Sequence, residues 1–373
     1  MAALGDLVAK MVRTEIADLT SNATFAFDLM TKEDNEIRGK GDSFQVGSFS
    51  AMTVNSDGSS LSITPEVPTR SALDLIIDNE PAIVQRIDRR EDSQAFGSPG
   101  AYARNVATQA VPTMRNEMDQ NLFDYFHISL TSYDSTASDP DGQYAINAGG
   151  ATITDALALS AVAKLNGNRG NDISAYRWFV ESYMHAKLAE LAGFTALVRQ
   201  PESGPSALGL PMVGMFHGIP VHLTAELPGS SARGRYTVAC TVVTIATNVA
   251  TITATGHGLV AGNLVTVTGT TEELTTAAAI TSVTNANVFV VPFTASDATP
   301  MADSAGTVTL DDSVNFLVDT RHVHVAESDN MMVRFADHTA STGKNLIVSP
   351  LYGRVGRRNR VISFYSPFES FTG

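Results

Sequence analysis

One long apolar stripe constrains the fold of this chain more than any other feature of the sequence. Between about Ser98 and Thr131, apolar side chains recur at the three- to four-residue spacing of a single helix face. At about 1.5 Å per residue, a helix of this length would extend roughly 50 Å, which exceeds the core of a small domain. Pro112 lies inside it and lacks a backbone N–H, so we expect a bend there or one turn earlier. The stripe consists of Val106, Ala110, Met114, Met118, Leu122 and Phe126.

The composition favours an acidic protein with much buried surface. The 373 residues allow two or three domains, and 25 basic against 39 acidic residues give a net charge of −14. Such a chain is not built for general attraction to phosphate backbones. Only 17% of the residues are charged, which suggests contacts with other subunits, although a β-rich chain full of Thr and Ser would look the same. The single Cys240 excludes an intrachain disulfide.

The segments before the long helix are predicted to be extended and incomplete on their own. Residues 1–40 form an amphipathic arm without the apolar core of a signal peptide, and no apolar run of the chain is long enough to span a membrane. Residues 41–81 form a long hairpin around the turn-rich segment 55–60. Because an isolated hairpin is marginally stable, we expect a neighbouring subunit to cover its apolar residues. These are Phe44, Val46 and Phe49 before the turn, and Leu73 and Leu75 after it.

After the long helix, helices and strands alternate until the composition changes abruptly. We expect helices over 154–165 and from Ser182, a buried strand over 176–180, and one strand through 216–223. Between Tyr236 and Leu310 there is no Lys or Arg, and 19 of the 75 residues are Thr. Short strands with Thr outside and Val or Ile inside, the latter including Val288 and Val290, predict an inserted small β-sandwich or barrel. From Val314 the earlier pattern of buried strands returns.

The sequence contains no convincing catalytic, cofactor or metal site, and we expect no enzyme. His322 and His324 would share one face of a strand and could bind a metal, but no third ligand has the spacing of a known motif. His257 lies in a Gly-His-Gly turn and is read as structural. Cys240 has no placed base and is read as a core residue.

A basic run near the C-terminus allows two interpretations. It comprises Arg354, Arg357, Arg358 and Arg360. It can be a solvated face or a set of ion pairs within an acidic protein. Alternatively, it can contact an acidic neighbouring subunit or nucleic acid, although the absence of interleaved aromatic residues argues against sequence reading.

The order of these elements resembles the major capsid protein of tailed bacteriophages, the Hong Kong 97-like fold. The segments that carry the resemblance are 75–79 with Ile87-Asp88 and Gln94, then 218–221 leading to 227–229, and finally 351–361. Segments 255–259 and 262–269 are similar to small Ig-like β modules of phage structural proteins. Residues 41–70 contain no Lys, so the resemblance gives no support for covalent cross-linking from this loop.

The resemblance implies an α+β fold with an inserted all-β, Ig-like sandwich. Its expected parts are an N-terminal arm (1–40), an extended loop (41–81), a peripheral domain with the spine helix at about 98–131 (82–192), an axial domain in two parts (193–235 and 311–345), the inserted β domain (236–310) and the closing strands of the peripheral domain (346–373).

The resemblance also implies a function, a location and partners. The chain would assemble into the hexamers and pentamers of an icosahedral shell that encloses double-stranded DNA, with the inserted β domain on the outside. Its location would be the virion, after assembly in the host bacterial cytoplasm. Expected partners are other copies, separate scaffolding and portal proteins, a possible decoration protein and non-specifically the packaged DNA. Expected contact residues are Arg354, Arg357, Arg358 and the apolar hairpin residues. The alternative is a phage tail or host-adhesion protein that binds through the β module.

Overall fold

The computed structural model describes most of the chain and divides it into two units. Described are residues 25–33, 40–49, 70–87, 99–133, 144–148, 153–166, 173–196, 212–230, 232–297, 299–302, 304–327, 332–337 and 344–367. The first unit contains 1–17, 31–110 and 323–356, and the second contains 18–30, 111–322 and 357–373. Most of the predicted arm and the hairpin residues 50–69 lie outside the described residues.

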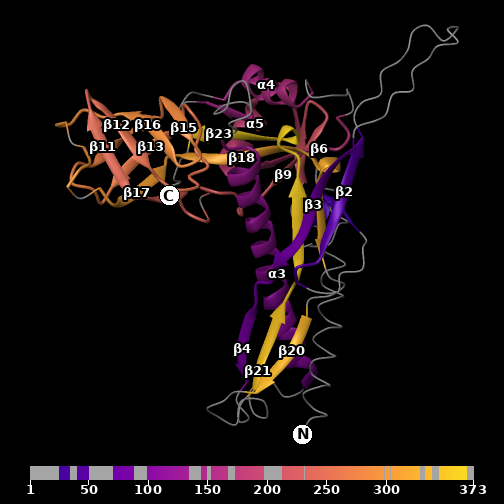
Figure 1. Cartoon of the computed structure of the whole chain (residues 1–373). Coiled ribbons are helices and arrows are strands. Elements are labelled where there is room, and N and C mark those ends of the chain that lie inside the picture. The colour runs from indigo at the N-terminus through magenta and orange to yellow at the C-terminus, as the bar shows by residue number, and fades with distance from the viewer. Residues whose placement is uncertain are drawn as a thin grey trace, which may run out of the picture. The chain divides into compact units, whose positions relative to one another are not determined.

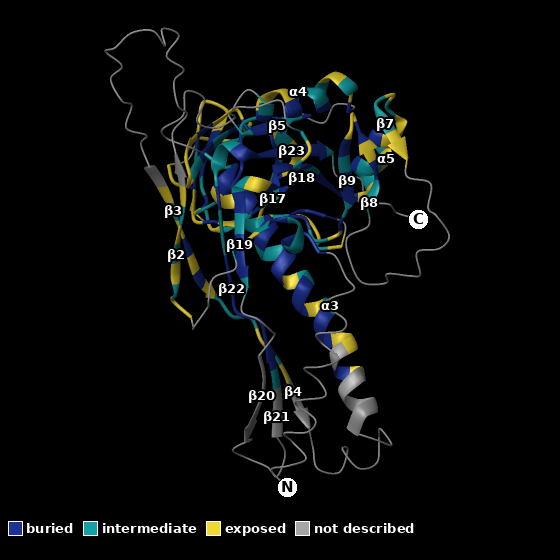
Figure 2. Cartoon of the chain, turned by 90° about the vertical axis from the view of Figure 1, so that its right-hand side faces the viewer, coloured by how far each residue is buried: buried dark blue, intermediate teal, exposed yellow. Residues whose placement is uncertain are grey.

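The long helix is present where the sequence predicts it. Helix α3 (Pro99–Tyr125) continues into the π-helical turn η2 (Phe126–Leu130), and Pro112 lies inside α3. All six residues of the predicted stripe, from Val106 to Phe126, are buried. Figure 2 shows buried and exposed residues alternating along α3, as expected for an amphipathic helix. The bend at Pro112 stays a prediction.

The first unit contains two sheets. The five-stranded sheet has the order β1-β19-β22-β3-β2, and the three-stranded sheet has the order β20-β21-β4. β1 pairs in parallel with β19, and the other pairings are antiparallel. Their bounds are β1 Thr31–Lys32, β2 Ser43–Phe49, β3 Arg70–Asn79, β4 Ile83–Ile87, β19 Val323–Glu327, β20 Met332–Asp337, β21 Lys344–Ser349 and β22 Tyr352–Gly356.

The second unit is built on a seven-stranded mixed sheet of order β5-β23-β18-β6-β9-β8-β7. Every residue of β18 is buried, as expected for a central strand covered on both faces. One face packs helices α4 and α5 around Trp178, and the other receives Phe123 of α3, which contacts Phe179 and Phe316. The bounds are β5 Ala145–Asn147, α4 Asp155–Asn166, β6 Tyr176–Val180, α5 Ser182–Glu190, β7 Phe194–Ala196, β8 Met212–Phe216, β9 Ile219–Leu223, β18 Asp312–Asp319 and β23 Val361–Pro367.

The prediction of one strand through 216–223 is wrong, because β8 and β9 form a tight hairpin there. Phe216 pairs with Ile219, so the loop has two residues, His217 and Gly218. Both have positive φ, 47° and 80°, as required in the type I′ turn that suits the twist of paired strands. A His in the first turn position is uncommon, since Asn or Asp is preferred there. The apolar residues on both sides therefore looked continuous in the sequence.

The Thr-rich region 237–310 forms two four-stranded sheets with only antiparallel pairings (Figure 1). Their orders are β10-β17-β13-β14 and β11-β12-β16-β15. Val288 and Val290 share a face with Thr253 and Thr251, their register partners, and are half-buried, so the prediction that they point inward is wrong. Phe289 and Val291 point inward instead. The bounds are β10 Thr237–Cys240, β11 Val242–Ala246, β12 Val249–Thr253, β13 Leu264–Thr268, β14 Leu274–Ala279, β15 Ser282–Asn285, β16 Val288–Pro292 and β17 Gly306–Leu310.

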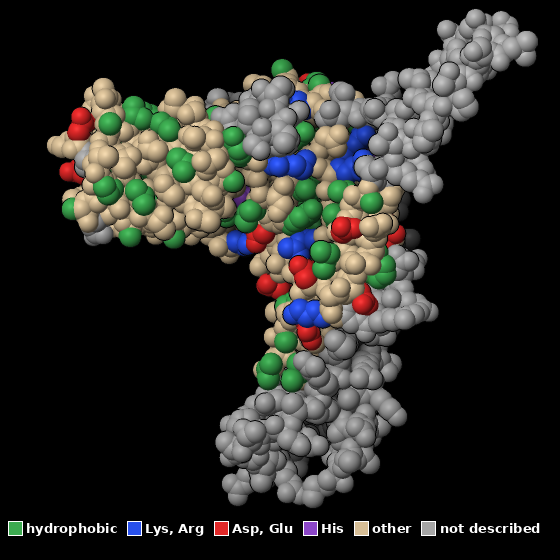
Figure 3. Space-filling model, in the orientation of Figure 1, with side chains coloured by type: hydrophobic (Ala, Val, Ile, Leu, Met, Phe, Trp, Pro, Cys, Tyr) green, Lys and Arg blue, Asp and Glu red, His purple; other side chains and the backbone are tan. Residues whose placement is uncertain are grey.

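The surface of this region differs from the rest of the chain. Figure 3 shows no basic side chain on the visible face of the region, in agreement with the absence of Lys and Arg between 236 and 310. Of the helices in the described residues, none has the length and apolarity needed to cross a bilayer.

Candidate subunit-contact site

The predicted hairpin is confirmed by the pairing of β2 with β3. The register places Phe44 opposite Leu75, Val46 opposite Leu73 and Phe49 opposite Arg70. Successive side chains of a strand point to opposite faces, so Phe44, Val46, Leu73 and Leu75 share one face. The register therefore gives the hairpin one apolar face and one more polar face.

The chain itself covers the apolar face of the described part of the hairpin. Leu75 and Ile77 are fully buried with Ala326 and Leu351, and the half-buried Phe44, Val46 and Val355 pack against them. This corrects the expectation that only a neighbouring subunit supplies the cover. It also corrects the role expected for Leu75, whose side chain has no exposed surface for a second copy. The physical reason is that β22 and β19 extend the hairpin into a five-stranded sheet with its own apolar cluster.

The first unit exposes two large apolar residues, on two different sheets, that sequence reasoning missed. Ile76 on β3 is 48% exposed, and Val84 on β4 is 58% exposed. In the run Leu75-Ile76-Ile77, alternation requires the middle residue to face away from the other two, and this signal was available in the sequence. Leu73 is half-buried, and Phe49 ends β2 opposite Arg70.

The arginines of the basic run have separate environments. The Arg358 guanidinium donates to the carbonyls of Ser132 at 2.6 Å and Tyr133 at 2.9 Å, and Nε donates to Leu130 at 3.4 Å. It thereby caps the free carbonyls at the end of η2. These hydrogen bonds hold Arg358 to its own chain, and its expected role as a subunit contact stays a prediction.

The remaining arginines of the run also lie in ordered segments. The Arg357 backbone N–H donates to the His322 carbonyl at 3.3 Å, and Arg354 is half-buried on β22 opposite Val325. Arg360 is buried and forms an ion pair with Asp319 at 3.4 Å. The ion-pair interpretation of the run therefore holds for Arg360.

The two histidines considered as metal ligands have separate carboxylate partners in the structure. His322 lies in the 3₁₀ turn η3 (Thr320–His322), not on a strand, with Nε2 3.7 Å from Asp319. His324 lies on β19, with Nδ1 2.7 Å from the Glu33 carboxylate. In the part of the chain that the structure describes, no group of three or more His, Cys, Asp or Glu could hold a metal.

Cys240 is buried, as the sequence predicts, and His257, which was read as structural, is buried as well. Nδ1 of His257 accepts the Leu259 N–H at 3.0 Å, so Nε2 is the atom that donates to the Asn285 carbonyl at 3.2 Å. Burial lowers the pKa of His257 to about 4, which keeps the ring neutral near pH 7. Burial likewise raises the pKa of the Cys240 thiol, which argues against a reactive thiolate.

A buried carboxylate fastens a segment near the N-terminus to α3. Asp119 accepts the backbone N–H groups of Ala26 and Phe27, each at 2.9 Å. The same segment includes Asp28, which lies 3.8 Å from Arg115 of α3. Burial outweighs these contacts and raises the pKa of Asp119 to about 7. Sequence reasoning missed this contact, because residues 92 and 93 positions apart give no local signal.

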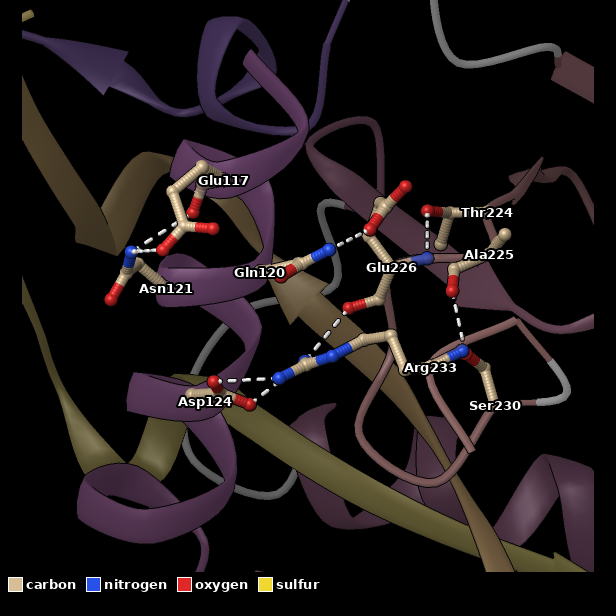
Figure 4. Close-up of polar contacts among 9 residues, drawn as sticks. All are labelled: Glu117, Gln120, Asn121, Asp124, Thr224, Ala225, Glu226, Ser230 and Arg233. Carbon is tan, nitrogen blue, oxygen red and sulfur yellow. Dashed lines mark hydrogen bonds and ion pairs between the residues drawn. The ribbon is translucent and has the colours of Figure 1, made fainter. Parts of the chain in front are cut away.

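A second set of contacts fastens the segment between β9 and β10 to α3 (Figure 4). Arg233 forms a bidentate ion pair with Asp124, and it also donates to the Glu226 carbonyl at 3.1 Å. The Glu226 carboxylate accepts a hydrogen bond from Gln120. The chain enters the two β sheets of 237–310 directly after this segment. These contacts therefore attach to α3 one of the two segments that connect those sheets to the rest of the second unit.

Solved structures give the comparison that decides the fold, whereas no protein-family model and no curated protein matches the sequence. The capsid of Ralstonia phage GP4 matches with a TM-score of 0.51 at 10% identity, over 92% of this chain and 88% of that chain. The chain has the Hong Kong 97-like capsid fold. The mature capsid of bacteriophage PhiM1 matches with a TM-score of 0.49, at 11% identity over 93% and 88% of the two chains. Mycobacterium phage Che8 matches with 0.46, at 16% identity over 92% and 91%.

The capsid fold accounts for the order of elements along the chain. In this order, the β2–β3 hairpin, strand β4 and long α3 precede the mixed seven-stranded sheet. The predicted α+β class, with the long hairpin before the spine helix, is confirmed. At 10% identity, the similarity establishes the fold only, and no residue role is transferred from it.

Proposed function

We propose that this chain is the major capsid protein of a tailed phage and assembles into the hexamers and pentamers of an icosahedral shell around double-stranded DNA. The observation that carries the proposal is the likeness to the capsid of Ralstonia phage GP4, which extends over 92% of the chain. The similarity therefore includes the hairpin and the spine helix as well as the mixed sheet, and the matched structure is a capsid.

The proposed contact surface comprises Ile76 on the outward face of the hairpin sheet and Val84 on β4 of the three-stranded sheet. They are the two most exposed large apolar residues of the described chain. Phe44, Val46 and Leu73 stay proposed contacts through the exposed parts of their side chains on the opposite face of the hairpin, and Phe49 stays one by its position at the end of β2. Burying the side chains of Ile76 and Val84 would each contribute roughly 1 kcal/mol at about 25 cal/mol per Å². Repeated at every contact of a shell, this contribution is substantial.

The proposal keeps the finer expectations from the sequence. The two sheets of 237–310 are an Ig-like module displayed on the outer surface, and the peripheral and axial domains have the boundaries given above. Assembly takes place in the host bacterial cytoplasm, with separate scaffolding and portal proteins and a possible decoration protein. The cation-free composition of the module supports its display, since it has no basic side chains to hold DNA.

Electron microscopy of the purified full-length chain tests the proposal. Closed shells are the expected result, and tubes or monodisperse monomers under all assembly conditions would contradict it. Because Phe49 and Arg70 are register partners, an Asn-Gly turn can replace residues 50–69 without changing the pairing of β2 with β3. This variant should remain folded and soluble but should not form shells.

A matched pair of point variants tests the contact surface. Ile76→Asp places a charge on the outward face and should prevent assembly at unchanged thermal stability. Asp74→Asn, on the same face of the same strand, removes a charge and should still assemble. Equal assembly of both variants would exclude this face as a subunit contact.

A further inference from the structure

The two sheets of region 237–310 differ in the side chains that they turn outward. In β11, β12 and β16 of one sheet, every second residue is buried, including Val243, Ile252 and Phe289. Because successive side chains of a strand point to opposite faces, the residues between them point outward. The register aligns these outward residues across the three strands into one continuous surface. We name this surface the valine face, after Val242, Val249, Val288 and Val290.

The valine face is apolar and carries no charge. Val242 is 39% exposed and Val249 is 38% exposed, and Val288 and Val290 are half-buried. Their register partners on these three strands are Thr, Ala and Pro. Single exposed apolar residues are common on protein surfaces, whereas a contiguous group without charges is typical of a surface that contacts another protein.

The outward face of the other sheet gives an internal comparison. Its aligned outward residues are Thr with one Ala, although both sheets share the same Thr-rich composition without Lys or Arg. The Thr hydroxyls keep that face hydrated, so only on the valine face does covering remove a row of apolar side chains from water. The aligned residues of the other sheet are Thr237, Thr309 and Thr266 in one row, and Ala239, Thr307 and Thr268 in the next.

We infer that the valine face is a contact surface between copies of this chain, at which the valine face of one copy packs on that of a second copy. The inference rests on the proposed function, because a shell places many copies side by side, and it adds a contact that is separate from the hairpin. Two twisted sheets pack face to face through interdigitating side chains, with a separation of about 10 Å. Flat rows of β-branched residues suit such packing.

The distribution of charge favours a second copy over a basic partner. Between residues 236 and 310, Glu272, Glu273, Asp297 and Asp303 face no Lys or Arg in the sequence. Two such regions repel each other except where neither presents a charge, as on the valine face. A basic partner would be drawn elsewhere, because Glu272 and Glu273 lie between β13 and β14 of the other sheet. Asp297 lies at one end of the valine face, where it accepts the Thr247 N–H at 2.9 Å.

The size of the valine face limits the strength of the contact. Three strands of five residues cover roughly 240 Å² of sheet, whereas a stable complex buries about 800 Å² per partner. Free copies should therefore not dimerise through this face at micromolar concentration. The contact forms where another interaction already holds the copies side by side and raises their effective concentration.

Cysteine cross-linking of the full-length chain tests the inference. Thr251→Cys lies at the centre of the valine face, and Thr266→Cys in the other sheet is the matched control. Both threonines are half-buried in the middle of a five-residue strand. A bis-maleimide that spans about 10 Å, the separation of packed sheets, is added to assembled particles. Thr251→Cys should give at least about 5-fold more covalent dimer than Thr266→Cys, and the wild type gives the background from the buried Cys240.

A charge on the valine face checks that the cross-link reports this contact. In the Thr251→Cys chain, Val249→Glu brings two carboxylates together and should lower the dimer yield to that of Thr266→Cys. Its fold should persist in circular dichroism, because Val249 is exposed at the start of β12. Thr268→Glu, on the outward face of the other sheet, should leave the yield unchanged. Equal yields from Thr251→Cys and Thr266→Cys, or a yield that Val249→Glu leaves unchanged, would overturn the inference.

Electron microscopy of the same samples separates the inference from the proposed function. Preferential cross-linking of Thr251→Cys in closed shells supports both, and in tubes or other particles it supports the inference alone. Shells with equal yields overturn the inference and leave the proposed function standing, since the valine face would then be free or hold a different molecule. If the chain forms no particles, cross-linking at millimolar concentration decides, and the same preference is required there.

Discussion

Arg233 and Asp124 form a bidentate ion pair, with both nitrogen–oxygen distances 2.9 Å (Figure 4). Arg233 lies just before β10, and Asp124 lies in the last turn of α3. Basic groups interact favourably with the C-terminal end of a helix, so Arg233 is placed well for both the carboxylate and the helix dipole. The pair fixes where the chain leaves the core and enters the two β sheets.

We predict that Arg233→Met lowers the free energy of unfolding by about 1–2 kcal/mol. The pair is partly exposed, so screening by water reduces its contribution, but its bidentate geometry makes it stronger than an ordinary surface pair. Urea unfolding followed by circular dichroism measures the change. Lys187→Met breaks the partly exposed, monodentate pair with Glu190 at 3.5 Å and the contact of the ammonium with the Tyr183 ring, and should cost less than about 1 kcal/mol. Equal losses would show that the bidentate geometry adds nothing.

Gly353 permits the close approach of β22 to β3. A Cβ at this position would lie 2.2 Å from the Ile76 carbonyl oxygen, a backbone atom that cannot rotate away. We predict that Gly353→Ala lowers the free energy of unfolding by about 1–3 kcal/mol, the usual cost of overpacking. Gly47→Ala on β2 of the same sheet is the control, since nothing lies within 4 Å of its Cβ position. A loss with Gly47→Ala as large as with Gly353→Ala would contradict the steric explanation.

The titration of Asp119 should change how the free energy of unfolding depends on pH. With its pKa raised from 3.8 to about 7, the folded state keeps a proton between pH 4 and pH 7 that the unfolded state has released. Asp119 therefore lowers stability as pH rises through this window. His127 acts oppositely, because burial lowers its pKa to about 3, and a buried neutral ring favours folding as pH rises from 3 to 6.5.

We predict that Asp119→Asn steepens the rise of stability with pH. The difference in unfolding free energy, variant minus wild type, should increase by about 1 kcal/mol per pH unit between pH 4.5 and 6.5 and then level off. Asn offers only one acceptor oxygen, so the variant loses one of the bonds to Ala26 and Phe27 at every pH. Urea unfolding at four pH values measures the difference. Curves that run parallel for wild type and variant would exclude a titrating Asp119.

The long helix could be predicted because its signal is local and repeated. Six apolar positions at helical spacing remain buried in the structure, and the change in composition at Tyr236 marks where the two β sheets begin. Such signals depend on periodicity and propensity along one stretch of chain. They establish which elements exist, and here they also gave the order that resembles the capsid fold.

The candidate site was predicted less well, because it depends on contacts between distant segments. Leu75 looked exposed on an isolated hairpin, but β22 and β19, some 250 residues later, bury it. Arg358 looked available, but its partners are carbonyls 225 to 228 residues earlier. No local pattern reports whether a distant strand or helix end will cover a side chain. The exposed Ile76 is the exception, since the alternation of side chains along β3 alone places it on the other face from Leu75 and Ile77.

The chain segments that enter and leave the two β sheets of 237–310 lie side by side. For this reason the region can be removed by a short connection. The Leu310 N–H donates to the Tyr236 carbonyl at 2.9 Å, and Arg235 pairs with Asp311. We predict that joining Tyr236 to Asp311 by Gly-Gly leaves a folded chain that still forms shells, because the linker spans a gap that one hydrogen bond already bridges.

The shortened chain should nevertheless be less stable than the full-length chain. Asp312 loses the Leu264 N–H that it accepts at 3.0 Å, and the Tyr365 hydroxyl loses the Gly258 carbonyl at 3.5 Å. We expect a loss of roughly 1–3 kcal/mol, the usual cost of leaving such groups without a partner, measured by urea unfolding. Adding Asp312→Asn to the shortened chain removes the orphaned carboxylate and should recover part of that loss. A shortened chain that unfolds outright would show that the β sheets are part of the core, and shells of normal appearance would show that they are not needed for assembly.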